Sequence, residues 1–506
     1  MKLQRTKNAT RNIFWGIVYQ IVNILLPFVA RTLFIKILGE EYLGLNSLFG
    51  SILSIINISE LGISSAIVYS MYEAIARDDD EAICALMNFY RKCYCIIGCI
   101  VLGIGCAFIP FLPNLISGTV PEDANIYILY VINLLNMGIP YFLFAYKHSL
   151  FWAFQRDDLS QKVVIPLDIA RYVVQIIGLM ITKNYYVYLI VLPIFSIITN
   201  VARAKVIDKH YPQYVARGKI DKKTLHQIIY KVKALVVSKI GSTLVTSFDA
   251  IVISMYLGIA ILGKYNNYNY IMTSVIGFVQ LLFTAVGAGI GNSLKTESKE
   301  KNYRDFIELT YINDWILCFC SACFLSLYQP FITLWIGDDF LLPMTSVVLI
   351  VIYFYAQRMP SVLSTYRDAA GIWEKDQFRP IVVGVSNLIL NVILVKHIGL
   401  PGVLLSSILT WIGIGIPWQL HISVDGLFPG KRWNYVLYLV KDAVLTGVIA
   451  IVIYALCSLI QGQDILSFIL KGVLCVIISN LLFYIATCRR KECKSFLQRI
   501  KGMLKR

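Results

Sequence analysis

The chain has 506 residues, of which 58% are hydrophobic and only 15% are charged, and its mean hydropathy is +0.68. A soluble core of this length cannot hide so much apolar surface, so the composition excludes a soluble globular protein and indicates a chain that lies in lipid. The formal net charge of +16 would suggest a nucleic-acid partner for a soluble protein, whereas in a membrane protein it reports topology.

Stretches of about 20 mostly apolar residues, the length that a membrane-spanning helix needs, recur along the whole chain. We predict about fourteen spans, and therefore an all-α integral membrane protein with no room for a soluble catalytic domain. In chain order the predicted spans cover residues 12–37, 43–71, 92–113, 125–147, 163–182, 185–204, 232–258, 265–291, 306–327, 345–366, 380–396, 400–421, 435–458 and 465–487.

Lysine and arginine gather in alternate loops between these spans, with about 36 on one side of the membrane and about 4 on the other. Because cytoplasmic loops carry the excess of cations, both termini are predicted to be cytoplasmic. The richest segments are residues 203–233 and 489–506. Topology alone explains them, and binding of anionic lipid is the alternative.

A repeat with an offset of about 219 residues runs through the chain. LGEEYLG at 38–44 returns as LGIAILG at 257–263, and FQRD at 154–157 returns as WEKD at 373–376. An even number of spans separates the copies, so both halves should enter the membrane in the same direction. The predicted parts are an N-lobe at 1–205, a basic cytoplasmic linker at 206–231, a C-lobe at 232–421, two further spans at 422–487 and a basic cytoplasmic tail at 488–506. Apolar residues at helical spacing suit the tail to a helix on the inner leaflet, and a solvated tail is the alternative.

Polar side chains recur at three- and four-residue steps on the first, second, seventh and eighth spans. In lipid such faces should turn to the interior of the bundle or to a hydrated cavity, so they predict a pathway. Gln20, Asn23 and Asn57 are the candidate substrate contacts of this kind. The alternative is that small polar side chains bond neighbouring helices.

Charged residues inside spans are costly, at about 2.5–3.5 kcal/mol each, so they are usually functional or paired. An anionic substrate that carries phosphate would need cations, and four are predicted to contact it: Arg31, Arg171, Lys239 and Arg358. Two carboxylates are predicted candidates for binding a coupling proton or sodium ion: Glu60 and Asp249. The alternative is an internal ion pair, such as one between Asp168 and Arg171. The remaining charges within spans are Asp314, Lys441, Asp442 and Lys471.

The sequence contains no hydrolase, transferase or nucleotide-binding motif, and its histidines and cysteines show no convincing metal-ligand spacing. We therefore predict that the chain is not an enzyme and uses no cofactor or metal.

Several strings are similar to the Wzx-type oligosaccharide flippases of the multidrug, oligosaccharidyl-lipid and polysaccharide exporter superfamily. They are ISELGISSAI at 58–67, SFDAIVISMYLG at 247–258, GKYNNYNYI at 263–271, LWIGDDFL at 334–341 and YRDAAGIWEKDQFRP at 366–380. The resemblance covers both lobes and implies a MATE-like fold of two six-helix lobes, to which this chain adds two C-terminal helices. It further implies alternating access that moves undecaprenyl-diphosphate-linked oligosaccharide repeat units from the cytoplasmic to the outer leaflet, for capsule, exopolysaccharide or O-antigen.

The resemblance also implies the partners and the location. The partners would be the lipid-linked glycan, membrane lipids, a polysaccharide polymerase and glycosyltransferases, with no nucleic acid, in a bacterial cytoplasmic membrane. One alternative is a multidrug cation exporter of the same superfamily, which should have a cavity dominated by carboxylates. A membrane-embedded polysaccharide polymerase or ligase is the other, but it should carry a large external loop, and the longest predicted external segments, near 111–125 and 328–344, are short.

Overall fold

The computed structural model describes residues 5–57 and 63–504, with the side chains of some residues, among them 233–242, outside the description. The described residues form helices and no strand, which confirms the predicted all-helical fold. The chain divides into two compact units, Met1–Gly263 and Lys264–Arg506, here called unit 1 and unit 2. Each unit is described separately below.

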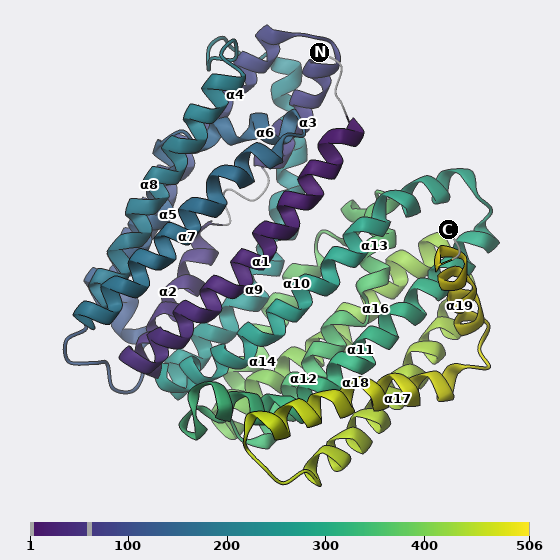
Figure 1. The fold of residues 1–506 in the computed structure, drawn as a ribbon. Coiled ribbons are helices and arrows are strands. Elements are labelled where there is room, and N and C mark those ends of the chain that lie inside the picture. Colours follow the sequence, from purple (N-terminus) through teal and green to yellow (C-terminus); the bar gives the residue numbers. More distant parts are fainter. Residues whose placement is uncertain (1–4, 58–62, 505–506) are drawn as a thin grey trace. The chain divides into compact units, whose positions relative to one another are not determined.

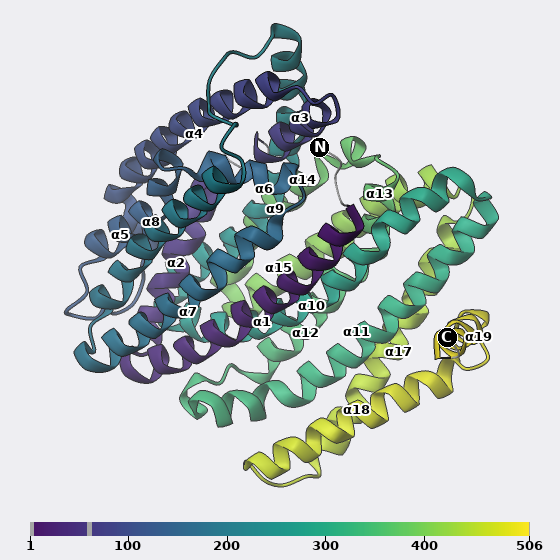
Figure 2. The ribbon, with the colours of Figure 1, turned by 45° about the horizontal axis from the view of Figure 1, so that its top comes forward.

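Unit 1 is built from nine helices and two short 3-10 segments among the described residues, and helix α10 begins at its end (Figure 1). In Figure 2, α4, α5 and α8 lie side by side, and α5 packs both on the preceding helix α4 and on the more distant helix α8. The elements are α1 (Arg5–Leu38), α2 (Glu40–Ile56), α3 (Ile63–Ala76), α4 (Asp80–Phe108), η2 (Ile109–Leu115), α5 (Ile126–Phe142), η3 (Ala145–His148), α6 (Ser149–Ala153), α7 (Asp157–Thr182), α8 (Tyr185–His210) and α9 (Lys222–Leu257).

Unit 2 contains most of α10 and the helices that follow it. Helix α11 is its central element, because α12, α17, α18 and α19 all pack against it. The elements are α10 (Ile259–Thr296), α11 (Lys299–Ile336), η4 (Asp338–Phe340), α12 (Met344–Arg358), α13 (Ser361–Ala369), η5 (Trp373–Asp376), α14 (Arg379–Ile398), α15 (Leu400–Thr410), η6 (Trp411–Gly415), α16 (Ile416–Gln419), η7 (Leu420–Asp425), α17 (Arg432–Ser458), α18 (Ile465–Thr487) and α19 (Lys491–Leu504).

Ten helices among the described residues are long and apolar enough to cross a membrane, or up to eleven if the bent pair α5 and η3–α6 is one span. The chain is therefore a multi-pass membrane protein. The pair bends by 64° just after Pro140, a residue that breaks the backbone hydrogen-bond ladder of a helix. The three other predicted spans fall on α2 with α3, on α9 and on α10, so the count of about fourteen stays a prediction.

The two copies of the LG…LG repeat meet inside unit 1. A Cβ atom added to Gly44 would lie 2.0 Å from the Ile259 carbonyl oxygen, and one added to Gly263 would lie 2.3 Å from the Glu40 carbonyl oxygen. Both contacts are with backbone, so only glycine fits at either position. The glycine that opens each copy has the same left-handed backbone, with φ of 92° at Gly39 and 93° at Gly258. The ends of α1 and α9 therefore lie together, as expected if both helices cross the membrane in the same direction.

The C-terminal tail forms helix α19, which packs on the core of unit 2. Phe496 contacts the rings of Tyr311 and Trp315 of α11 at 6.4 and 5.7 Å. At the next turn the Arg499 guanidinium pairs with Asp305 at 2.8 Å and with Glu308 at 2.6 Å. The apolar face predicted for the tail thus packs, at least at Phe496, against protein.

Candidate functional site

Two of the predicted cations, Arg31 of α1 and Arg171 of α7, lie around one tyrosine of α8. Both guanidiniums are close enough to the Tyr188 hydroxyl for their charges to act on it. Helix α1 is held there by ring contacts of Phe34 with Tyr185 and Tyr188, at centroid distances of 5.4 and 5.1 Å. The fold therefore brings together two arginines that are far apart in the sequence.

Arg171 also forms the ion pair that the sequence offered as an alternative. Its Nη2 lies 3.2 Å from Asp168 Oδ1, and the two side chains keep 22% and 18% of their surface exposed. The guanidinium carbon stands 4.5 Å from the centre of the Tyr172 ring. Its Nε, however, has no hydrogen-bond partner in the described part of the chain. Arg171 is thus paired on one edge and retains a buried donor on another.

A third arginine, Arg203, extends this arrangement along α8. Its charge acts on Asp168, on Asp157 and on Tyr19 of α1, and its Nε is a second buried donor without a partner among the described residues. Arg31, Arg171 and Arg203 are called the cation stripe below. The sequence prediction missed Arg203 because it counted this residue in the basic segment 203–233, whereas helix α8 continues to His210. The continued helical pattern of Asn200, Arg203 and Ile207 was the available signal.

The three polar residues predicted to contact substrate in unit 1 differ in their surroundings. Gln20 is half-buried on α1. Asn23 Nδ2 donates to the Tyr19 carbonyl oxygen of its own helix at 3.2 Å. Asn57, just after α2, accepts a hydrogen bond from the Tyr141 hydroxyl of α5. Asn57 therefore joins two helices in this structure.

The other predicted site residues are not part of the cation stripe. Asp249 is buried on α9, at 5% exposure. Arg358, at the end of α12, donates from Nη1 to Gln280 Oε1 of α10 at 3.4 Å, within unit 2. Glu60 and the side chain of Lys239 lie outside the described residues. The roles predicted for all four stay predictions.

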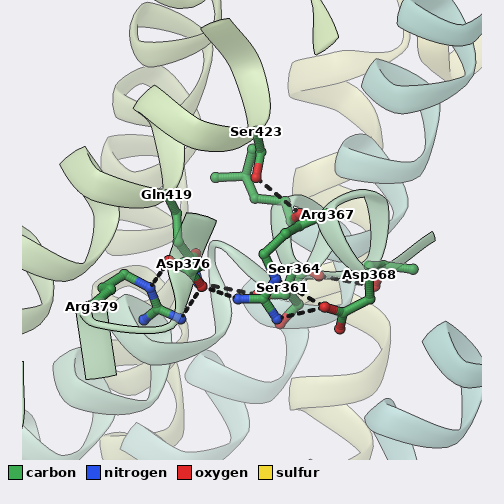
Figure 3. Close-up of polar contacts among 10 residues, drawn as sticks. Ser361, Ser364, Arg367, Asp368, Asp376, Arg379, Gln419 and Ser423 are labelled. Atoms are coloured by element: carbon green, nitrogen blue, oxygen red, sulfur yellow. Dashed lines mark hydrogen bonds and ion pairs between the residues drawn. The ribbon is translucent and has the colours of Figure 1, made fainter. Parts of the chain in front are cut away.

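Unit 2 contains an ion-pair cluster in the YRDAAGIWEKDQFRP string, between α13 and α14 (Figure 3). Asp376, at 3% exposure, accepts two hydrogen bonds of 2.8 Å from Arg379 and a further one from Arg367. Arg367 Nε also donates to Asp368 at 2.9 Å, and Arg379 stands over the Trp411 ring at 5.8 Å. The cluster fixes the connection between two helices, and these contacts were not predicted from the sequence.

Unit 1 has a related cluster beside the FQRD copy of the repeat. Asp158, with no exposed side-chain surface, pairs with Arg156 at 2.8 Å and with Lys162 at 3.6 Å. The hydrogen bond to Asp158 raises the pKa of Arg156. Asn12 of α1 accepts from the Asp158 backbone N–H at 2.9 Å and donates to the Gln155 carbonyl oxygen at 3.1 Å. This cluster ties the start of α1 to the start of α7.

An apolar cavity of about 590 Å³ lies within unit 2, bordered by α11, α12, the span from α15 to η7, and α17. Its lining includes Leu325, Ile352, Ile416, Leu439 and Ile451. Such a lining suits hydrocarbon better than a polar or charged group. No group of three or more His, Cys, Asp or Glu side chains that could hold a metal ion occurs among the described residues.

Comparison with known proteins gives one family and a set of similar folds. Residues 9–290 match the sequence model of a family described as Polysaccharide biosynthesis protein. A search of curated protein sequences gives no match.

Three solved structures illustrate the fold. A lipid II flippase, MurJ, in an inward closed conformation is 18% identical, with 93% of this chain and 99% of that chain covered and a TM-score of 0.69. An inward-facing multidrug resistance MATE family transporter of the MOP superfamily is 14% identical over 79% and 94% of the two chains, at a TM-score of 0.62. A mutant Vibrio cholerae MATE transporter is 13% identical over 83% and 98%, at 0.58. This likeness confirms the predicted MATE-like fold.

Proposed function

Because the chain belongs to the polysaccharide biosynthesis protein family, we propose that it is a flippase for lipid-linked oligosaccharides. The family match supports the resemblance to the oligosaccharide flippases and covers the quoted strings at 58–67, 247–258 and 263–271. The substrate that we propose is an undecaprenyl-diphosphate-linked repeat unit, moved from the cytoplasmic to the outer leaflet by alternating access. The membrane would be a bacterial cytoplasmic membrane, with both termini in the cytoplasm, as the distribution of lysine and arginine favours.

The observation that carries this proposal is the cation stripe in unit 1. A diphosphate is the constant part of such lipids, and guanidinium groups bind phosphate oxygens through paired, charge-assisted hydrogen bonds. Arg171 and Arg203 each retain a buried Nε–H without a partner in the described chain. A buried donor of this kind is costly unless a ligand or water satisfies it. The stripe is therefore suited to receive an anionic head group.

The apolar cavity of unit 2 is evidence for the lipid part of the proposed substrate. Its lining of aliphatic side chains suits a section of a polyprenyl chain. A water-soluble sugar phosphate has no such chain. Gln20, Asn23 and Asn57 remain proposed contacts for the polar head, with Lys239 and Arg358 as further cations. Glu60 and Asp249 remain proposed sites for a coupling ion.

The first test is export by arginine variants at matched protein level. In cells that depend on this chain for surface polysaccharide, Arg203→Gln and Arg31→Gln should each reduce export at least about tenfold, the loss expected for one charge-assisted contact. Arg31→Lys should reduce it less, because it keeps the charge and loses only the paired geometry. Lys36→Gln, at an exposed position of the same helix α1, is the matched control and should export normally.

Two outcomes would contradict the proposal. Unchanged export by both glutamine variants would remove the stripe from the site. If the variants lost resistance to cationic drugs but still exported polysaccharide normally, the multidrug exporter would be favoured. Arg171 could bind substrate or serve only as the ion-pair partner of Asp168. If the double variant Asp168→Asn with Arg171→Gln exported more than Arg171→Gln alone, up to the normal level, Arg171 would act only as the partner of Asp168.

A further inference from the structure

Two aspartates on different helices lie together in the interior of unit 2. Asp314 of α11 and Asp442 of α17 both have no exposed side-chain surface. Their carboxyl groups are within hydrogen-bonding reach of each other. Helices α11 and α17 pack along each other, so the pair lies inside the helix bundle.

Within the described part of the chain, Asp442 forms an ion pair and Asp314 forms none. Arg490, which follows α18, places Nη1 at 2.6 Å from Asp442 Oδ1 and at 2.9 Å from Oδ2. Burial alone would lower the pKa of Arg490, but the Asp442 carboxylate raises it, so the guanidinium stays charged. Two ionised carboxylates beside one arginine would leave a net negative charge at a buried position, which is strongly unfavourable.

The other titratable groups around the pair do not supply the missing positive charge. Among the described residues these groups come from the helices packed around the pair, and all but the carboxylate of α19 are neutral in their ordinary state. They are Cys318 on α11, Tyr355 on α12, Tyr435 and Tyr438 on α17, and Glu492 on α19. Helix α18 contributes the uncharged Asn480 and Thr487, which bond the Trp315 and Tyr311 side chains of α11. The compensation must therefore come from a bound cation or proton.

Unsatisfied atoms indicate where that proton or cation would bind. Neither carboxylate oxygen of Asp314 has a hydrogen-bond partner of good geometry in the described chain, and the same holds for the hydroxyl of Thr446, which is 4% exposed. Two ionised carboxylates only accept hydrogen bonds, so they cannot bond each other. If one of them carries a proton, the short approach of Asp314 to Asp442 becomes a hydrogen bond.

We propose that Asp314 and Asp442 together bind one proton, which forms a buried proton-binding site between α11 and α17. The proton leaves one negative charge, which Arg490 neutralises. Its loss would place two like charges against each other and push α17 away from α11. This inference does not depend on the molecule that the chain transports.

The proposal gives a definite sign to the effect of pH on stability. An aspartate in water releases its proton at about pH 4, so in the unfolded chain neither Asp314 nor Asp442 is protonated at neutral pH. A folded state that keeps the proton loses stability as pH rises through the release of that proton. The full-length protein in detergent should therefore melt at progressively lower temperature as the pH becomes alkaline.

Asparagine at position 314 mimics the protonated carboxyl. Asp314→Asn should melt within a few degrees of wild type at neutral pH and should flatten the alkaline decline. Asp442→Asn should melt lower at every pH, because it removes the ion-pair partner of the half-buried Arg490. Asp464→Asn, at an exposed position before α18, is the matched control and should keep the wild-type pH profile.

Infrared spectroscopy of the wild-type protein supplies a readout that does not rely on any variant folding. It should show the C=O stretch of a protonated carboxyl at neutral pH, and Asp314→Asn should remove it. An absent band in the wild type would overturn the proposal, as would an alkaline decline that persists in Asp314→Asn. Stabilisation of the wild type by sodium at fixed pH, lost in Asp314→Asn, would overturn it in favour of a sodium site.

Discussion

Each unit buries one aspartate beside a copy of the repeat, but the two units neutralise that charge in different surroundings. In unit 2, Asp376 is held by Arg367 and Arg379, whose side chains are only 15% and 8% exposed. In unit 1, Asp158 is fully buried, but its two cations keep 24% and 44% of their surface exposed. The cations of unit 1 can therefore return to water if their partner is lost, whereas those of unit 2 remain in the protein.

The difference shows that two copies of a sequence repeat can both bury a carboxylate although the side chains that form the two clusters differ. The repeat aligns Asp157 with Asp376, yet the buried carboxylate of unit 1 belongs to the next residue, and Asp157 instead accepts a hydrogen bond from Gln161 at 2.8 Å. Unit 1 adds Asn12 of α1 to its cluster. The cluster of unit 2 connects neighbouring segments of the chain, and that of unit 1 connects α7 to a distant helix.

The largest effect is expected from Asp376→Ala. Removal of this carboxylate leaves the buried Arg379 guanidinium without its anion and Arg367 with only the exposed Asp368, which should destabilise the fold by about 3–5 kcal/mol. Thermal melting of the detergent-purified chain and the yield of monodisperse protein would measure this. Asp368→Ala in the same loop is the control, because the Asp368 side chain is 60% exposed and, among the described residues, forms an ion pair with Arg367 alone. Equal losses from the two variants would show that the Asp376 cluster has no special role.

A smaller effect is expected from Asp158→Ala. Here Arg156 and Lys162 can hydrate, so the loss should fall to about 1–3 kcal/mol, chiefly from the lost hydrogen bonds. The same melting assay applies, with Asp157→Ala as the neighbouring control. If Asp158→Ala proved as damaging as Asp376→Ala, the exposure of the partner cations would not explain the contrast between the units.

Much of the fold was predictable because it depends on local composition and on backbone geometry. Apolar stretches predicted the helices, and the repeated LG pattern predicted two equivalent turns, which Gly39 and Gly258 form with nearly the same φ. The family resemblance was visible in short strings for the same reason. These features are encoded in consecutive residues.

The contacts of the candidate site were less predictable because they join distant helices. The sequence offered Arg31 and Arg171 as separate cations, and only the packing of α1 and α7 on α8 brings both to Tyr188. Arg203 was missed because it also opens the basic segment 203–233, so its charge was counted with the cytoplasmic side although helix α8 continues to His210. The pairing of Asp314 with Asp442 likewise depends on which faces of α11 and α17 meet.

The smallest of these effects, and the one that best isolates the link to α1, is expected from Asn12→Ala. This change removes the acceptor for the Asp158 N–H and the donor to the Gln155 carbonyl oxygen, two bonds that together should contribute about 1–2 kcal/mol. Melting should fall accordingly while Asp158 keeps its cations. Asn23→Ala should change stability by less, because within the described chain the Asn23 side chain bonds only the Tyr19 carbonyl oxygen of its own helix. The Asn12 side chain bonds the segment at the start of α7, whereas the Asn23 side chain bonds its own helix, so the comparison tests the hydrogen bonds between α1 and α7. A smaller loss at position 12 than at position 23 would mean that the start of α1 is held by apolar packing and not by the Asp158 cluster.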